Sequence, residues 1–363
     1  MVWGEMSLNI YVGRGEADDD FRSSREPARR RPLVSGLVYT LLLAAFVPLC
    51  AGCHSPTSTT AVPQTKASTQ PASTAISFTD DLGHAVSLAK PAQRVVSLSP
   101  NLTESMFAIG ADDLLVGVTE FCKYPPEAQS KPHIGGIINP VLEKVLAAKP
   151  DLVLGARGNP DQFLKRLVDM KVTVASFDPQ TLDAAIDLLR KLGGLCGRER
   201  KASQVADALS ARAVSIRAQA VKPATPPKAL FILEWQPLFV AGPKSFVDDM
   251  IRAGGGVNVV KGENIAAGAN ADSPWPQVSA EKMIALDPDI IIFAKAQGAG
   301  VDTSGIISRM KSDAAWKNVS AIRANHIYAV DDDLVTIPGP RLVDGLAEVV
   351  RIIGEAPAAS PQR

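Results

Sequence analysis

The sequence predicts an α/β protein built from two similar lobes that are joined by a long helix. The first observation behind this prediction is an internal repeat. LEKVLAAKPDLVL at residues 142–154 recurs as AEKMIALDPDIII at residues 280–292, with five of thirteen positions identical. Each copy is typical of a short helix ended near a proline and followed by a strand buried on both faces of a parallel sheet.

The second observation is the matched spacing around the two copies. Glu143 lies 48 positions after Val95, which begins an apolar run, and Glu281 lies 51 positions after Leu230, which lies near the start of another. In both halves, strand-like runs alternate with helix-like runs, as in parallel sheets flanked by helices. The spacing therefore indicates duplication of a whole lobe.

The third observation is the stretch between the lobes, residues 181–227, which has no strand pattern. Within it, residues 198–221 are rich in Ala and other strong helix formers. At about 1.5 Å per residue, 24 helical residues span roughly 36 Å. We expect this helix to run from residues 76–180, the N-terminal lobe, to residues 228–356, the C-terminal lobe.

The front of the chain is typical of an export signal and a tether. Residues 1–52 contain an Arg-rich stretch, an apolar run at 33–49 and small residues directly before Cys53. Residues 53–75 are nearly all Ser, Thr, Pro, Ala and Gln, so we expect a disordered tether. A cysteine at the cleavage site resembles a bacterial lipoprotein signal, which implies lipidation of Cys53 and a membrane-tethered protein in the periplasm or at the cell surface.

Composition excludes some functions and leaves others open. The formal net charge is zero, so no basic surface indicates nucleic-acid binding. The sequence has no G-x-S-x-G elbow, no phosphate-binding G-x-x-x-x-G-K-[ST] loop and no dinucleotide-binding G-x-G-x-x-G after a strand, so an enzyme is not expected. Cys122 and Cys196 could pair in an oxidising compartment, but their spacing does not predict contact.

Five motifs together resemble one family of binding proteins. VSLSPNLTESMFAIGA, YPPEA, LEKVLAAKPDLVL, SPWPQVSAEK and PGPRLVDGLAEVV resemble the periplasmic substrate-binding proteins of ABC importers for vitamin B12, iron-siderophores and haem. The resemblance implies two Rossmann-like lobes on a helical backbone, of the metal and cobalamin receptor type, with a ligand cleft between them. It also implies a monomer that delivers its ligand to an ABC permease. The alternative binding role is a protein that scavenges a ligand without a permease.

Candidate ligand residues follow the predicted strands, because open α/β sheets bind ligands at the carboxyl ends of their strands. They are Ser99, Pro100, Asn101, Tyr124, Arg157, Trp235, Trp275, Asp333 and Arg341. The resemblance implies that Tyr124, Trp275 and Trp235 offer aromatic faces to a macrocycle. It also implies that Glu143 and Glu281 pair with permease arginines, whereas from the residues alone each could simply be an acid favoured in a first helical turn.

The ligand stays open among a corrinoid, which is favoured, a ferric siderophore and haem. HIGGIIN and LGARGN lack the Trp that the best-known cobalamin binders place there, so the pocket is expected to be less aromatic. Tyr124 or His133 could ligate a haem iron, and Arg157 or Arg341 could pair with a propionate or a siderophore acid. No resident cofactor and no direct metal site are expected, because His54, His84, His133 and His326 lie in unrelated segments. Trp316 is expected in the core.

Overall fold

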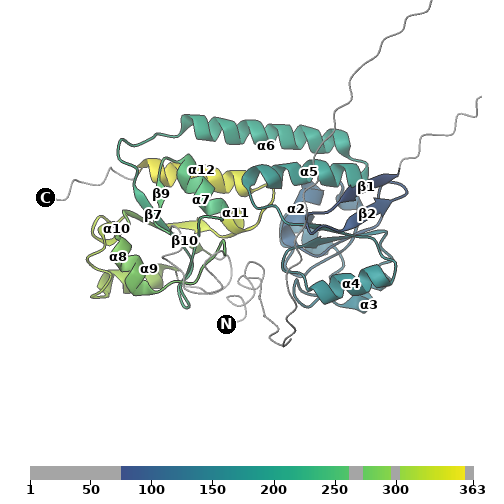
Figure 1. The fold of residues 1–363 in the computed structure, drawn as a ribbon, viewed down its shortest axis with the longest axis horizontal. Helices are drawn as coiled ribbons and strands as arrows, with labels where there is room; N and C mark the ends of the chain where they lie inside the picture. The colour runs from purple at the N-terminus through teal and green to yellow at the C-terminus, as the bar shows by residue number, and fades with distance from the viewer. Residues whose placement is uncertain (1–74, 261–272, 296–302, 356–363) are drawn as a thin grey trace, which may run out of the picture. The chain divides into compact units, whose positions relative to one another are not determined.

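The computed structural model describes residues 75–260, 273–295 and 303–355. These residues belong to one compact unit, in which two α/β lobes lie under the long helix α6 (Figure 1). The predicted signal region, the lipidation site Cys53 and the tether up to residue 74 lie outside the described residues. Among the described residues, no helix has the length and apolar character needed to cross a membrane.

The N-terminal lobe contains a parallel sheet of four strands in the order β4-β3-β5-β6. Its strands are β3 (Val95–Ser97), β4 (Leu115–Val118), β5 (Leu152–Ala156) and β6 (Val174–Phe177). The helices that connect them are α2 (Pro100–Ala108), η1 (Asp112–Leu114), η2 (Pro126–Ser130), α3 (Leu142–Ala147) and α4 (Asp161–Asp169). Alternation of strand and helix along the chain gives the parallel pairing that the sequence predicted.

The C-terminal lobe repeats this order of strands. Strand β7 lies between β9 and β10, and β11 lies beyond β10, all in parallel pairs, while β8 adds an antiparallel strand beside β7. The strands are β7 (Lys228–Glu234), β8 (Phe239–Val240), β9 (Val257–Asn258), β10 (Ile290–Lys295) and β11 (Ile327–Asp331). The helices are α7 (Phe246–Ala253), α8 (Ala280–Leu286), α9 (Thr303–Ser312), α10 (Ser320–Arg323) and α11 (Asp333–Thr336). This equivalence supports the predicted duplication.

The repeated strands are buried on both faces, as their apolar runs predicted. In β5, Leu152 and Leu154 face the core that contains α5, whereas Val153 faces a second core beneath α3 and α4, and all three are 0% exposed. In β10, Ile290 and Ile292 join the first of these cores and Ile291 joins a separate core of the C-terminal lobe. Alternation along a strand thus distributes one apolar run between two layers.

The residues around the proline of each repeat have the same backbone geometry. Lys149 and Asp287, which directly precede the two prolines, both have positive φ, at 47° and 45°. Two residues later, Asp151 accepts hydrogen bonds from the N–H groups of Gln93 and Arg94, at 2.8 and 2.9 Å. The equivalent Asp289 accepts one from Lys228, at 2.8 Å. Each aspartate therefore ties the start of one strand to the start of its neighbour.

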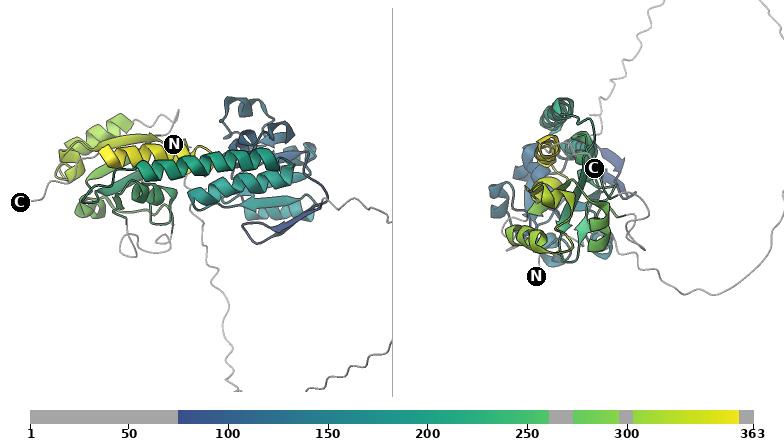
Figure 2. Two further views of the ribbon diagram at one scale, coloured as in Figure 1. Left: turned by 90° about the horizontal axis from the view of Figure 1, so that it is seen from above. Right: turned by 90° about the vertical axis from the view of Figure 1, so that its left-hand side faces the viewer.

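Three helices connect the lobes. They are α5 (Leu182–Cys196), α6 (Glu199–Gln219) and α12 (Leu342–Glu355). Helix α6 packs on both α5 and α12, and Figure 2 shows it lying along them. One core runs from Leu102 in the N-terminal lobe through Leu189 in α5 to Leu346 in α12. Because this core is continuous, the lobes share more than the single long helix that the sequence predicted.

A hairpin precedes the first sheet and consists of the antiparallel strands β1 (Ile76–Thr79) and β2 (Ala85–Leu88). Its turn lies against the outer edge of β6. Asp80 accepts from the N–H of Ser176 at 2.9 Å, and Asp81 accepts from the N–H of Asp178 at 3.0 Å. The turn therefore satisfies polar backbone groups at the carboxyl end of an edge strand.

The two cysteines whose pairing the sequence left open are both free and buried. The thiol of Cys122 lies 3.1 Å from the hydroxyl of Thr103 and 3.2 Å from that of Thr119. Cys196 lies 3.8 Å from the sulfur of Met106. Burial raises the pKa of Cys122 and raises that of Cys196 to about 12, so both are thiols at neutral pH.

Candidate functional site

A cavity of ≈ 190 Å³ has walls from both lobes. Its N-terminal wall consists of segments that follow β3, β5 and β6, the place where parallel sheets expose the ends of their strands. Its C-terminal wall comes from the start of α7, the segment before α8 and the segment before α12. The lining residues are Ser99, Asn101, Ala156, Arg157, Phe177, Asp178, Pro179, Gln180, Lys244, Phe246, Pro274, Trp275 and Pro338.

The start of α2 contributes two of the predicted residues to this cavity. Pro100 occupies the first turn of the helix, and the hydroxyl of Ser99, at the N-cap position, does not cap it. It donates instead to Oδ1 of Asn101, at 2.6 Å. Nearby, the buried Asn159 donates to the carbonyls of Leu98 and Ile137, at 3.1 and 3.0 Å. These bonds fix the loops after β3 and β5 around the cavity.

Arg157 lines the cavity and is engaged by an acidic side chain of the same wall. Its Nε donates to Asp178 at 2.5 Å, and its Nη2 forms an ion pair with the same carboxylate. Gln180 donates to the other oxygen of Asp178, also at 2.5 Å. The hydrogen bond with Asp178 raises the pKa of Arg157. The two sequence-distant segments thus form one charge-balanced surface.

Arg341 joins the lobes through a second carboxylate. Its Nη2 and Nε donate to the two oxygens of Glu104 in α2, at 2.6 and 3.0 Å, and Asp333 lies 3.5 Å away. The guanidinium carbon stacks 4.0 Å from the ring centroid of Tyr124. Three of the predicted residues, Tyr124, Asp333 and Arg341, are therefore brought together.

Glu104 is almost fully buried, with 3% of its side chain exposed. Burial raises its pKa, and the hydrogen bonds from Arg341 oppose that rise. Burial also lowers the pKa of Arg341, but its hydrogen bonds and attraction to Glu104 raise it overall. Each charge in this pair depends on the other, because a lone buried charge is strongly disfavoured.

Sequence reasoning missed both carboxylate partners. Glu104 lies in a helix between the buried Leu102 and Met106, so a charged residue on an apolar helix face was the available signal. Asp178 directly follows the buried strand β6. The predicted ligand residues hold the same kind of position after other strands. Their pairing with arginines 237 and 21 positions away could be seen only in the folded chain.

The three predicted aromatic contacts fall in different places. Tyr124 is 45% exposed, which suits contact with a ligand. Trp275 is in the cavity wall but only 1% exposed, and its ring lies 6.1 Å from that of Phe231. Trp275 therefore supports the wall and does not offer a ring face.

Trp235 lies outside the lining of this cavity. Its ring packs 5.4 Å from that of Trp316 and 6.4 Å from that of Phe293, against the core of the C-terminal lobe. The position of Trp235 thus does not support the ligand role expected for it, because its ring is used in packing. Trp316 is buried, as predicted.

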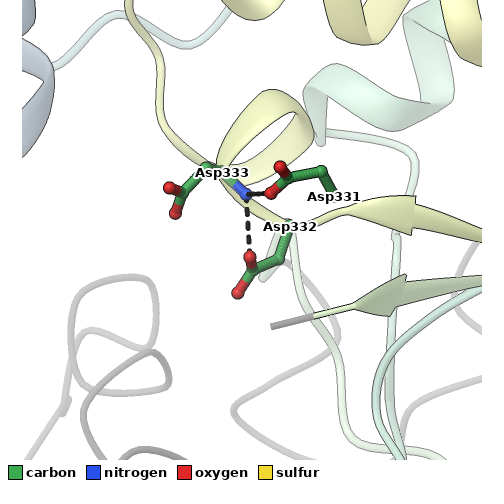
Figure 3. A group of neighbouring side chains, drawn as sticks. All are labelled: Asp331, Asp332 and Asp333. Atoms are coloured by element: carbon green, nitrogen blue, oxygen red, sulfur yellow. Dashed lines mark hydrogen bonds between the residues drawn. The ribbon is translucent and has the colours of Figure 1, made fainter. Parts of the chain in front are cut away.

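Three consecutive aspartates end β11 and begin α11. Asp331, Asp332 and Asp333 each place a carboxylate oxygen within 4.8 Å of the others. Figure 3 shows that the N–H of Asp333 donates to both Asp331 and Asp332, at 3.1 and 2.9 Å. Burial, with repulsion from Asp333 and Asp331, raises the pKa of Asp332 to about 6. These hydrogen bonds and the nearby Arg341 account for the arrangement without a ligand.

The two repeat glutamates are exposed and lie on helices of different lobes. Glu143 is in the first turn of α3 and Glu281 in the first turn of α8. Figure 1 shows α3 and α8 on the side of the two lobes opposite α6. Ser279 caps α8, accepting from the N–H of Lys282 at 3.3 Å, and Glu281 bonds to its own backbone N–H and to Ser279, which lowers its pKa.

Two duplicated α/β lobes on shared helices, with a cavity between them, define a ligand-binding protein of the two-lobed class. A family model described as "Periplasmic binding protein" matches residues 95–334. The chain belongs to this family, which supplies the binding components of ABC importers. The characterised relatives are binding proteins and not enzymes.

Three relatives show what the chain resembles. It is 28% identical to an ABC transporter substrate-binding lipoprotein, YvrC, of Bacillus subtilis, over 88% of this chain and 96% of the relative. The crystal structure of the periplasmic vitamin B12 binding protein BtuF of Vibrio cholerae matches with a TM-score of 0.64 and 26% identity, covering 74% of this chain and 99% of BtuF. The periplasmic heme-binding protein RhuT of Roseiflexus sp. RS-1 matches with a TM-score of 0.62 and 28% identity, covering 73% and 98%.

Proposed function

We propose that this protein binds a corrinoid between its lobes and delivers it to the permease of an ABC importer. The observation that carries the proposal is the cavity with walls from both lobes, in a fold shared over 99% of the length of a vitamin B12 binding protein. Tyr124 is outside the lining of this cavity, but its exposed ring stacks on Arg341, three residues after the lining residue Pro338. The cavity volume of ≈ 190 Å³ is below the 300 to 1,000 Å³ of common ligand pockets, so a macrocycle requires the walls to separate.

The ligand is tested by titration of the purified protein. Cyanocobalamin, haemin and a ferric siderophore are added in separate titrations while tryptophan fluorescence and co-eluting ligand colour are followed. We expect a response to cyanocobalamin. A response to haemin or the siderophore with none to cyanocobalamin would replace the corrinoid in the proposal.

Haem is the second candidate. The similarity to RhuT and the exposed phenol of Tyr124 favour it, because a tyrosine oxygen can ligate haem iron. His133 is also exposed. Tyr124→Phe should abolish a haem-iron charge-transfer band if Tyr124 is the ligand, whereas the affinity for cyanocobalamin should change little.

Delivery to a permease is assigned to Glu143 and Glu281. Both are exposed and both occupy the same place in the repeat, and their helices α3 and α8 lie on the side away from α6 (Figure 1). Substituting both by Ala should reduce uptake at least tenfold and leave ligand affinity unchanged. Glu199→Ala is the matched control, since Glu199 is an exposed first-turn acid of α6. Loss of ligand affinity in the double variant would contradict the docking role.

Membrane attachment through a lipid on Cys53 completes the proposal. It is supported by the signal-like sequence before Cys53 and by the description of YvrC as a lipoprotein. Labelling of cells with a radioactive or clickable fatty acid should mark the wild-type protein. Cys53→Ser should abolish the label, and persistence of the label would rule out this site.

A further inference from the structure

Both arginines that could pair with an acidic ligand are already paired within the chain. Arg157 is bound to Asp178, and Arg341 is bound to Glu104. These two arginines come from different lobes. Arg157 lines the cavity, whereas Arg341 is outside its lining but follows the lining residue Pro338 by three positions. The third cation of this region, Lys244, also lines the cavity and also interacts within the chain.

The Arg341–Glu104 pair is bidentate and uses one edge of the guanidinium, formed by Nε and Nη2. The two hydrogen bonds are at 2.6 and 3.0 Å, and 16% of the arginine side chain and 3% of the glutamate side chain are exposed. Gly339, in the segment leading to Arg341, lies beside α2, where an added Cβ would make ordinary contacts with Oε2 of Glu104 at 3.5 Å and with Cα of Asn101 at 3.6 Å. The pair therefore lies next to Asn101, which lines the cavity.

The Arg157–Asp178 pair is held in place by the hairpin of β1 and β2. Asp178 has an 11% exposed side chain, and its N–H donates to Asp81, which also forms an ion pair with Lys191 at 2.7 Å. Phe177, one residue earlier, stacks on Phe78 of the hairpin with ring centroids 6.3 Å apart. The hairpin therefore fixes the position of the carboxylate that neutralises Arg157.

We propose that Asp178 and Glu104 are specificity determinants, which make the site select a ligand whose periphery carries neutral hydrogen-bonding groups, such as carboxamides, over one that carries carboxylates. A ligand carboxylate would have to share a guanidinium with a carboxylate of the protein, and like charges placed together are strongly disfavoured. A neutral amide avoids this repulsion. It can accept from guanidinium N–H groups, of which an arginine has five, and can donate to carboxylate oxygens. This inference rests on the proposed binding of a ligand between the lobes.

The test compares ligands that differ only in charge. Cyanocobalamin is paired with its monocarboxylic acid, in which one peripheral amide is hydrolysed, and haemin is paired with its dimethyl ester. We expect the wild-type protein to bind the neutral member of the pair at least about tenfold more tightly, which corresponds to about 1.4 kcal/mol. Asp178→Asn should reduce this preference to about threefold or less, because Arg157 then becomes available to the acid.

Controls separate this effect from general loss of charge. Asp207→Asn removes the carboxylate from an exposed pair with Arg190 on the connecting helices, and it should keep the wild-type preference. Glu104→Gln should also weaken the preference, and Glu348→Gln is its matched control, because Glu348 forms an exposed two-bond pair with Arg351. Circular dichroism and thermal unfolding identify any variant that fails to fold.

The outcomes distinguish this inference from the proposed function. Failure to bind either corrinoid, with binding of the haem pair, overturns the corrinoid proposal, and the preference is then read from haemin and its ester. Equal binding of the acidic and neutral members, or tighter binding of the acidic one, overturns the specificity inference whichever ligand class is bound. An unchanged preference in both folded variants does so as well.

Discussion

The two lobes use the same backbone geometry around the repeat but different side chains to hold it. Lys149 and Asp287 have nearly equal positive φ values, although one side chain is a cation and the other an anion. Arg94 donates to the carbonyls of Ala148 and Lys149, while the equivalent Lys228 donates to the carbonyl of Leu286. The comparison teaches that the path of the chain is preserved where strands must pair, and that several side chains can satisfy the same carbonyls.

The lobes also differ in the carboxylates that follow their equivalent edge strands, β6 and β11. Asp178 follows β6 and is paired with Arg157. Asp332 follows β11, the equivalent strand, and lies between Asp331 and Asp333. One lobe thus neutralises a carboxylate at this place and the other crowds it with like charges. Equivalent places in the two lobes therefore differ in charge, and only Asp178 of the two lines the cavity.

The largest expected effect concerns the aspartates that tie strand to strand. Asp151 accepts two backbone N–H groups and Asp289 accepts one. Asp151→Ala should lower the free energy of unfolding by about 2 kcal/mol, and Asp289→Ala by about 1 kcal/mol, because bonds to a charged acceptor are stronger than neutral ones. Urea unfolding measures both. Asp169→Ala, at an exposed position of α4, should be neutral, and equal losses at 151 and 289 would contradict the comparison.

The next effect concerns the two residues with positive φ. Lys149→Gly should raise the free energy of unfolding by roughly 0.5 kcal/mol. Glycine adopts a positive φ without the strain that a side chain causes, and this gain exceeds the cost of its larger conformational entropy in the unfolded chain.

Asp287→Gly should instead lower the free energy of unfolding by about 1.5 kcal/mol. Its carboxylate accepts from the N–H and hydroxyl of Ser320, at 2.7 and 2.9 Å, and glycine loses both bonds. Thermal unfolding of the two variants should move in opposite directions. A shift in the same direction would show that the side chain at 287 adds nothing to the shared backbone geometry.

A smaller effect is expected from the carboxylate of Asp332, which lies close to those of Asp331 and Asp333. The pKa of Asp332 is raised to about 6 in the folded protein from 3.8. Its contribution to stability is therefore fully present below about pH 3.8 and is lost as the pH rises through about 6. Asp332→Asn should add about 1 kcal/mol at pH 7.5, after allowance for solvent screening, and nothing near pH 3.5.

Unfolding of wild type and Asp332→Asn across this pH range measures the difference. Asn keeps an oxygen that can accept from the N–H of Asp333, as Asp332 does at 2.9 Å. Asp344→Asn, at an exposed ion pair with Arg212, controls for removal of one negative charge. A gain that does not vary with pH would show that ionisation of Asp332 is not its cause.

Effects of about the same size or smaller are expected at the helix starts that carry the two glutamates. Ser279→Ala should cost about 1 kcal/mol, because it removes the side-chain cap of α8. Val141 is the N-cap of α3 and offers no side-chain cap, so Val141→Ser should gain about 0.5 kcal/mol. Chemical unfolding measures both changes. If Val141→Ser lowers stability instead, the side chain of Val141 stabilises the start of α3 by packing, whereas Ser279 stabilises the start of α8 by capping.

Sequence reasoning predicted the fold closely because the signals were local. Apolar runs such as Leu152–Ala156, prolines after short helices and the helix-rich stretch before Gln219 correspond to elements of the structure. It predicted less of the site. Of the predicted residues, Arg157 lines the cavity, Tyr124 and Arg341 stack on each other outside its lining, and the half-buried Trp235 packs against the core of the C-terminal lobe. Burial of an aromatic ring depends on neighbours such as Trp316 that are far away in the chain.

The sequence by itself determined the duplicated α/β architecture, the long connecting helix and the exposed glutamates of the repeat, because periodicity and turn residues act over a few positions. Only the tertiary structure decided which charges neutralise each other. Glu104 and Arg341 are 237 positions apart, and Asp81 and Lys191 are 110 apart. Whether a side chain is available to a ligand depends on three-dimensional contact, and spacing along the chain does not report it.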